Sequence, residues 1–228
     1  MLKNFRIIDL TQPLYPEAPT WNGSCGFCLE IKKDYDRLFR VQQIKMHAGI
    51  GTHMDAPSHC IPGGLSIAEI PVSQLILPAC VLDVSGKAHG DYEVSLADLD
   101  AYEANYGIIP PQSLVIIYTG WSRLWAQPEA YRNVDSLGQM HFPAVSKKVA
   151  EVLLEREVAG LAIDTFSPDC LDQSYPVHNL FLGAGKYIIE NVADCSLMPP
   201  QGGYIIALPI KAEGATESPI RMVGLIPK

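Results

Sequence analysis

Short apolar runs bounded by turn residues recur along the chain and predict β-strands. β-Branched and aromatic side chains fit the half-buried surface of a pleated strand, whereas the Pro and Gly between the runs favour turns. Runs of this kind lie at residues 5–14, 76–86, 113–121, 160–169 and 203–211. Residues 39–55 begin with period-two alternation, which indicates one more strand, and then become rich in glycine. The chain is therefore expected to fold mainly as short strands.

Three further segments carry a helical pattern. Residues 95–107 begin with Ser95, a residue type that caps helix N-termini, and end with a glycine, which suits a C-cap. Apolar residues recur at helical spacing in residues 143–158, with charged residues between them. Residues 178–192 are expected to form a short helix that leads into an apolar segment. Because strands outnumber helices but alternate with them, we predict a single α/β domain, residues 1–228, with a mixed sheet and few helices.

Composition narrows the classes of partner. Hydrophobic residues make up 48% of the chain and charged residues 18%, which suits a compact globular protein. The net charge of −8, with scattered Lys and Arg, disfavours a nucleic-acid partner. The sequence has no apolar stretch of about 20 residues and no signal-peptide pattern, so we expect no membrane contact. The six dispersed cysteines are expected to be reduced thiols in a cytoplasmic protein.

Residues 47–60, HAGIGTHMDAPSHC, hold three of the six histidines together with an aspartate. His53, Asp55 and His59 lie at offsets 0, 2 and 6, so on an extended backbone their side chains point to one face. Imidazole and carboxylate groups together form a ligand set suited to Zn²⁺ or Mn²⁺. The segment therefore indicates a metal site, the alternative being a polar loop with histidines placed by chance.

A second group of polar residues lies later in the chain. His178 and Glu190 are twelve positions apart, and Glu190 follows an apolar run. A carboxylate in that position is seldom buried alone, and a nearby cation would supply its partner. Asp164, Ser167 and Asp169 follow a predicted strand, where they could support the site or simply form a turn. His178 and Glu190 strengthen the metal hypothesis.

These motifs resemble the metal-dependent cyclase and kynurenine formamidase-like hydrolase family. The resemblance is carried by GTHMDAPSH at 51–59, DTFSPD at 164–169 and the His178 and Glu190 pair, with IDLTQPLYPEAPTW near the start and YTGW at 118–121. It implies a swivelling β/β/α fold, assembled as a homodimer or homotetramer. It also implies hydrolysis of an amide or lactam bond at a centre of one or two metal ions.

The resemblance implies a role for each matching residue. His53 corresponds to a ligand of a first metal and His178 to a ligand of a second. Asp55 and Glu190 correspond to carboxylates that bridge the two ions.

One position departs from the family pattern H-x-G-T-H. Gly49 stands where the first histidine of that pattern would lie, and the nearest substitute is His47. On an extended strand their Cα atoms are roughly 6–7 Å apart, whereas a metal–nitrogen bond is only about 2.0–2.1 Å. Either His47 bends towards the metal, or water or another residue fills the gap, or the first metal binds weakly. We expect one divalent ion, Zn or Mn, with two possible and His47 a candidate ligand.

The predicted function is hydrolysis of a small cyclic or N-acyl (formyl) amide, lactam or lactone by a metal-bound hydroxide. The resemblance assigns His59 as the proton shuttle and Trp21 to the wall of the substrate pocket. Histidine suits proton transfer because its charge changes near neutral pH. Two alternatives stay open: a non-hydrolytic cyclase or dehydratase of the same family, and a metal- or ligand-binding protein with degraded catalysis.

Overall fold

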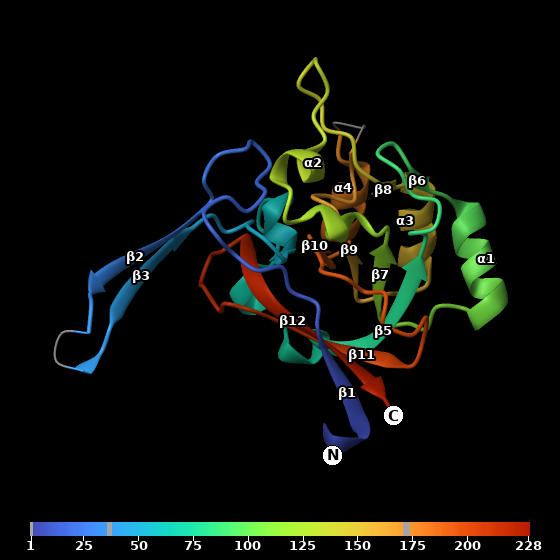
Figure 1. Cartoon of the computed structure of the whole chain (residues 1–228). Helices are drawn as coiled ribbons and strands as arrows, with labels where there is room; N and C mark the ends of the chain where they lie inside the picture. Colours follow the sequence, from blue (N-terminus) through green and yellow to red (C-terminus); the bar gives the residue numbers. More distant parts are fainter. Residues whose placement is uncertain (1, 36–37, 171–173) are drawn as a thin grey trace.

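The computed structural model describes residues 2–35, 38–170 and 174–228 and is organised around an eight-stranded mixed sheet (Figure 1). Its strands are β1 Phe5–Asp9, β4 His53–Asp55, β5 Ile76–Asp83, β7 Leu114–Tyr118, β9 Gly160–Ile163, β10 Tyr187–Glu190, β11 Gly203–Pro209 and β12 Glu217–Pro227. The strand order is β1-β12-β11-β5-β7-β9-β10-β4. β12 also pairs with β4, so the sheet closes on itself into a barrel-like shape.

The centre of the sheet is parallel and buried on both faces. β5, β7, β9 and β10 run parallel, and every residue of the last three is buried. Leu114 and Ile116 of β7 point into one apolar core with residues of β11 and β12. Val115 and Ile117 point into a second core, which the helices cover. Burial on both faces explains why these strands are continuous apolar runs rather than alternating ones.

The described residues form four α-helices: α1 Leu96–Tyr106, α2 Pro128–Arg132, α3 Lys147–Glu155 and α4 Pro176–Gly183. Ser95 caps α1 as predicted, and its backbone and side chain both bond to Asp98. Short 3-10 turns lie at Leu2–Asn4, Pro57–His59, Ile67–Glu69, Val72–Gln74 and Trp121–Leu124. The prediction of an α/β fold with a mixed sheet and few helices is confirmed. No helix among the described residues is both long and apolar enough to cross a membrane.

Some elements differ from the prediction. Val145, expected inside a helix, lies in a two-residue strand, β8 Ala144–Val145, which pairs with β6 Glu93–Val94 before α3 begins. The pattern did not reveal β12, because its prolines and a glycine interrupt the strand signal. A separate hairpin of β2 Phe27–Lys33 and β3 Val41–Met46 projects from the body of the molecule (Figure 1).

Candidate metal centre and cavity

Three strands bring the polar side chains of the candidate site together. β4 lies between β10 and β12 and is antiparallel to both. In this register His53 is opposite Glu190, and Asp55 is opposite Glu217. Because side chains alternate along a strand, His53 and Asp55 share one face while Met54 is buried in the apolar core. Residues distant in sequence therefore meet at one place on the sheet.

The ring of His53 is held with one nitrogen facing the carboxylates. Nδ1 lies 2.9 Å from the carbonyl oxygen of Gly51, which orients the ring. Nε2 lies 3.5 Å from Asp55 Oδ1 and 3.3 Å from Glu190 Oε2. Burial lowers the pKa of His53, but the charges of Asp55 and Glu190 outweigh it and raise the pKa to about 9. The surroundings of Nε2 therefore attract a positive charge, either a proton or a metal ion.

His178, on α4, faces the same carboxylates from the other side. Its Nε2 lies 3.3 Å from Glu190 Oε1 and 3.7 Å from Asp55 Oδ2. Its Nδ1 lies 2.8 Å from Asp169 Oδ2. Burial again opposes the charged ring, but hydrogen bonding to Asp169, Asp55 and Glu190 raises the pKa of His178 to about 12. Asp169 thus orients this histidine, which is the supporting role among the two that the sequence left open for it.

The donor atoms fit a divalent cation. The side chains form two groups of donors, His53 with Asp55 and Glu217, and Asp55 with His178 and Glu190. Within each group the donor atoms all lie within 4.8 Å of one another. Asp55 Oδ1 and Glu190 Oε1 are buried and have no hydrogen-bond partner among the described residues. A buried carboxylate oxygen without a hydrogen bond is costly, and a cation between these groups would bind to it directly. Nitrogen and carboxylate oxygen are donors that Zn²⁺ and Mn²⁺ accept.

His59 reaches the site by a turn rather than by the extended backbone that the sequence suggested. The strand ends at Asp55, and Pro57–His59 form a 3-10 turn. The ring of His59 stands 6.2 Å from that of His178, and its Nδ1 is 3.6 Å from Glu217 Oε2. The side chain is about one-third exposed. His59 therefore lies at the edge of the donor groups, in contact with solvent.

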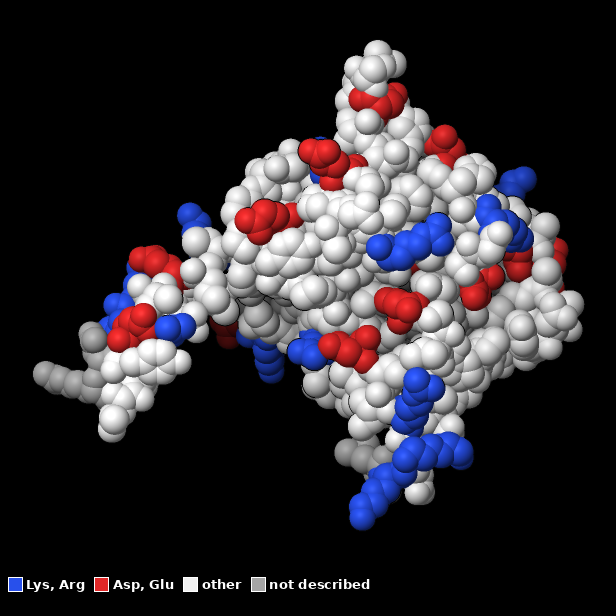
Figure 2. Space-filling model, viewed as in Figure 1, with Lys and Arg blue, Asp and Glu red and all other residues white. Residues whose placement is uncertain are grey.

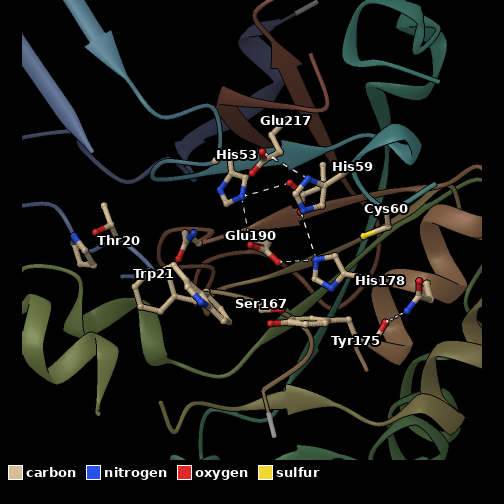
Figure 3. A pocket seen from close by; sticks show the side chains of 16 residues that line it. Thr20, Trp21, His53, His59, Cys60, Ser167, Tyr175, His178, Glu190 and Glu217 are labelled. Atoms are coloured by element: carbon tan, nitrogen blue, oxygen red, sulfur yellow. Dashed lines mark hydrogen bonds and ion pairs between the residues drawn. The ribbon is translucent and has the colours of Figure 1, made fainter. Parts of the chain in front are cut away.

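A cavity of about 500 Å³ opens over these donors (Figure 3). Trp21 forms part of its wall and packs edge-on against Phe142 and Phe166. Titratable donors form one part of the cavity lining and mainly aromatic or weakly polar residues form the other. The donors are His53, Asp55, His59, His178, Glu190 and Glu217, and the others include Thr20, Trp21, Cys60, Phe166 and Tyr175. An apolar wall beside a polar floor suits a small organic molecule with one polar reacting group.

The structure does not support His47 as a metal ligand. The side chain is exposed, and neither donor group formed by residues 2–35, 38–170 and 174–228 includes it. The backbone N–H of His47 donates to the carbonyl oxygen of Gly26, next to the hairpin. A turn between Met46 and His53 separates β3 from β4, so His47 and His53 do not lie on one continuous strand. The assignment of His47 is corrected for this reason.

Sequence reasoning missed Glu217. Its side chain lines the cavity and belongs to the first donor group. It is an isolated carboxylate in a segment without a recognisable motif, and it meets His53 only because β12 pairs with β4. The only available signal was a charged residue at the start of an apolar C-terminal segment.

Comparisons with known proteins agree with this fold and identify the family. The profile of a family described as "Putative cyclase" matches residues 8–170. An isatin hydrolase of Roseibium aggregatum is 32% identical, with 97% of this chain and 92% of the relative covered. A kynurenine formamidase of Bacillus cytotoxicus is 26% identical over 95% of each chain. The solved structure of isatin hydrolase A from Ralstonia solanacearum superposes with a TM-score of 0.92 at 31% identity, covering 98% of this chain and 93% of that one.

Proposed function

The chain belongs to the Cyclase family, and from that premise we propose that it is a metal-dependent hydrolase of carbon–nitrogen bonds other than peptide bonds. Its substrate is a small cyclic or N-acyl amide, with lactams and N-formyl amides first and lactones next. The observation that carries the proposal is the pair of donor groups that share Asp55 on the floor of a cavity. The names of the relatives, isatin hydrolase and kynurenine formamidase, support the same bond type.

Different residues of the site would bind the metal and transfer the proton. A divalent ion, Zn or Mn, held by His53, Asp55, His178 and Glu190 would polarise the scissile carbonyl and lower the pKa of water. His59 stands at the solvent edge of the site, where it can accept a proton from water and return it to the leaving nitrogen.

The remaining cavity residues position the substrate. Trp21 and Phe166 offer flat apolar surface at the cavity wall, against which the body of a ring or acyl group can pack. The volume of about 500 Å³ falls in the usual range for small-molecule sites, roughly 300–1,000 Å³. A small-molecule substrate is therefore part of the proposal. Figure 2 shows both acidic and basic side chains on the face in view.

The test combines metal analysis with a substrate panel. The purified protein is expected to contain Zn or Mn and to hydrolyse at least one member of a panel of N-formyl amides, lactams and lactones. Chelation should abolish turnover, and adding back Zn²⁺ or Mn²⁺ should restore it. Full turnover by protein shown to be metal-free would contradict the proposal.

The alternative of a binding protein with degraded catalysis rested on the missing histidine at Gly49. Glu217 occupies the space beside that glycine and offers a carboxylate to the same donor group, so the feature that favoured this alternative is weakened. Product analysis in the panel separates hydrolysis from the cyclase or dehydratase alternative, because only hydrolysis adds the elements of water.

We also propose that the chain works as a homodimer or homotetramer in the cytoplasm. The β2–β3 hairpin supports assembly, because one of its faces is apolar and exposed. Leu29 and Ile44 pair across it, and with Ile31 they are 47%, 57% and 48% exposed. A solvent-exposed apolar ribbon is typical of a contact surface. All six cysteines are free thiols, which supports a reducing compartment.

A further inference from the structure

We infer that Glu217 replaces the imidazole missing at Gly49 and completes the first metal site together with His53 and Asp55. The inference rests on the proposed function, because it assumes that the centre binds divalent metal. It adds a ligand from the opposite end of the chain, at a position outside the histidine motif. Two sites that share Asp55 would follow, one with Glu217 and one with His178 and Glu190.

The space around Gly49 shows why the two positions are linked. A Cβ atom added at Gly49 would collide with Oε1 of Glu217 and would lie 3.3 Å from Nε2 of His53. Gly49 is not among the glycines with a positive φ angle, so its backbone does not require glycine. The carboxylate of Glu217 therefore fills the volume into which a side chain at position 49 would extend. A histidine at 49 and the present conformation of Glu217 exclude each other.

The backbone holds Glu217 in this position. Glu217 is the first residue of β12 and pairs with Asp55 of β4. The next hydrogen bond, from Ala56 N–H to the carbonyl oxygen of Thr216, is 2.9 Å long. The register of two paired strands thus aims the side chain at the donors, which is more precise than placement by a free loop.

The carboxylate of Glu217 is available to a metal ion. Its ion-pair partner among the described residues is His59, and the 3.6 Å separation from Nδ1 exceeds hydrogen-bonding distance. Beside it, Asp55 Oδ1 is buried without a hydrogen-bond partner in the described part of the chain. A buried carboxylate oxygen without a hydrogen-bond partner is the independent sign that a cation belongs between these side chains.

The presence of Glu217 in place of a histidine at position 49 changes the chemistry of the first metal site. Exchanging an imidazole nitrogen for a carboxylate oxygen adds negative charge and makes the donor set harder. Carboxylate-rich sites suit Mn²⁺ better than imidazole-rich sites do. We therefore expect the site with Glu217 to favour Mn²⁺ over Zn²⁺ relative to a version of this chain that carries a histidine at position 49.

The experiment measures metal binding to the full chain by titration calorimetry with Mn²⁺ and Zn²⁺, and by the electron paramagnetic resonance of Mn²⁺. Wild type should bind two ions. Glu217→Ala should weaken one of them at least about 10-fold while the other is retained. Glu217→Gln, which keeps the shape of the side chain, should weaken the binding of the same ion.

The double variant Gly49→His with Glu217→Ala should recover binding of the second ion, with a shift of preference towards Zn²⁺. Glu213→Ala, at an exposed carboxylate in the preceding loop, is the control.

The outcomes separate this inference from the proposed function. If wild type binds two ions and both Glu217 variants bind them with unchanged affinity, Glu217 is not a ligand, although the metal-dependent hydrolase stands. If wild type binds a single ion that neither Glu217 variant weakens, the inference is likewise overturned. If wild type binds no divalent ion, the proposed function fails as well. Far-ultraviolet circular dichroism establishes that each variant is folded.

Discussion

Asp169 makes three hydrogen bonds with the first residues of α4. Its carboxylate accepts the backbone N–H groups of Val177 and His178, both at 3.0 Å, and contacts Nδ1 of His178 at 2.8 Å. With Nδ1 engaged, Nε2 of His178 is left to face Glu190 and Asp55. Such an outer partner fixes the tautomer of a histidine ligand and its direction. At the scale of single residues, the site thus depends on a carboxylate that lies outside both donor groups and outside the cavity lining.

Replacing the carboxylate of Asp169 by an amide should lower the affinity of the centre for metal without abolishing metal binding. Asp169→Asn removes the charge that favours His178 Nδ1–H, so we expect metal affinity to fall about 10–100-fold. Metal titration by calorimetry measures the change. The control is Glu151→Gln, the same chemical exchange at an exposed position on α3. Equal affinity in Asp169→Asn and wild type would show that the hydrogen bond has no such role.

His59 should be separable from the metal ligands by its effect on turnover. His59→Ala removes the proposed proton carrier but none of the donors in the two groups, so we expect turnover to fall about 10²–10⁴-fold with metal content unchanged. Steady-state kinetics and metal analysis of the same sample test both parts. His89→Ala, at an exposed histidine, is the matched control. A fully active His59→Ala protein would remove His59 from the mechanism.

At the scale of elements, the start of α1 carries a buried carboxylate away from the candidate site. Asp98 accepts hydrogen bonds from the backbone and side chain of Ser95 and pairs with Lys87. Burial raises the pKa of Asp98, but the hydrogen bonds from Lys87 and Ser95 outweigh it and lower the pKa to about 2. The side chain of Asp98 is only 3% exposed, whereas that of Lys87 is 55% exposed, so solvent screens part of the ion pair but little of the hydrogen bonding to Ser95. The helix start is therefore stabilised by an ionised carboxylate.

The stability of the protein should consequently depend on pH at the acid end. The folded pKa of Asp98, about 2, lies below its value of about 3.9 in the unfolded chain, so the unfolded state binds more protons between the two. The contribution is complete above about pH 5 and is lost as the pH falls towards 2, with a size of about 2 kcal/mol.

Asp98→Asn should flatten this acid dependence. Urea unfolding at a series of pH values from 7 to 2 measures the change. The variant is expected to be less stable than wild type at pH 7 and to lose less stability on acidification, because the titrating carboxylate is gone. Asp100→Asn, at an exposed position on the same helix, should follow the wild-type curve. Parallel curves for Asp98→Asn and wild type would contradict the assignment.

At the scale of the whole molecule, the β2–β3 hairpin stands apart from the barrel-like sheet (Figure 1). Its two faces differ, because Leu29, Ile31 and Ile44 share one face while Gln43 and Lys45 lie on the other. We expect Ile44→Glu to dissociate the proposed oligomer, because a buried unpaired charge at a contact is costly. Sedimentation velocity measures the change, with Gln43→Glu on the opposite face as control. An Ile44→Glu protein that sediments like wild type would exclude this face as the contact.

Much of the architecture was predictable from local pattern. The apolar runs of β5, β7, β9 and β11 and the cap at Ser95 depend on residues within a few positions of one another. β12 was not recognised, because Pro219 and Gly224 weaken the signal of a strand. Pro219 lies opposite His53, and a Cβ at Gly224 would press against Met198 and Ile8. The reason for these residues lies in their neighbours in space, which the local pattern does not contain.

The candidate site divides in the same way. His53, Asp55, His59, His178 and Glu190 were recognised because their residue types and spacing match a motif, and the fold brings them to one cavity. The sequence also proposed His47, which lies near Gly49 in the chain but on the far side of a turn. It gave no indication of Glu217, which is distant in the chain but adjacent through the β4–β12 pairing. Local sequence was sufficient for the kinds of ligand and for the strands that are apolar runs, since these follow from side-chain chemistry and short-range periodicity. Only the tertiary structure places Glu217 beside Gly49, because strand register is set by packing between distant segments.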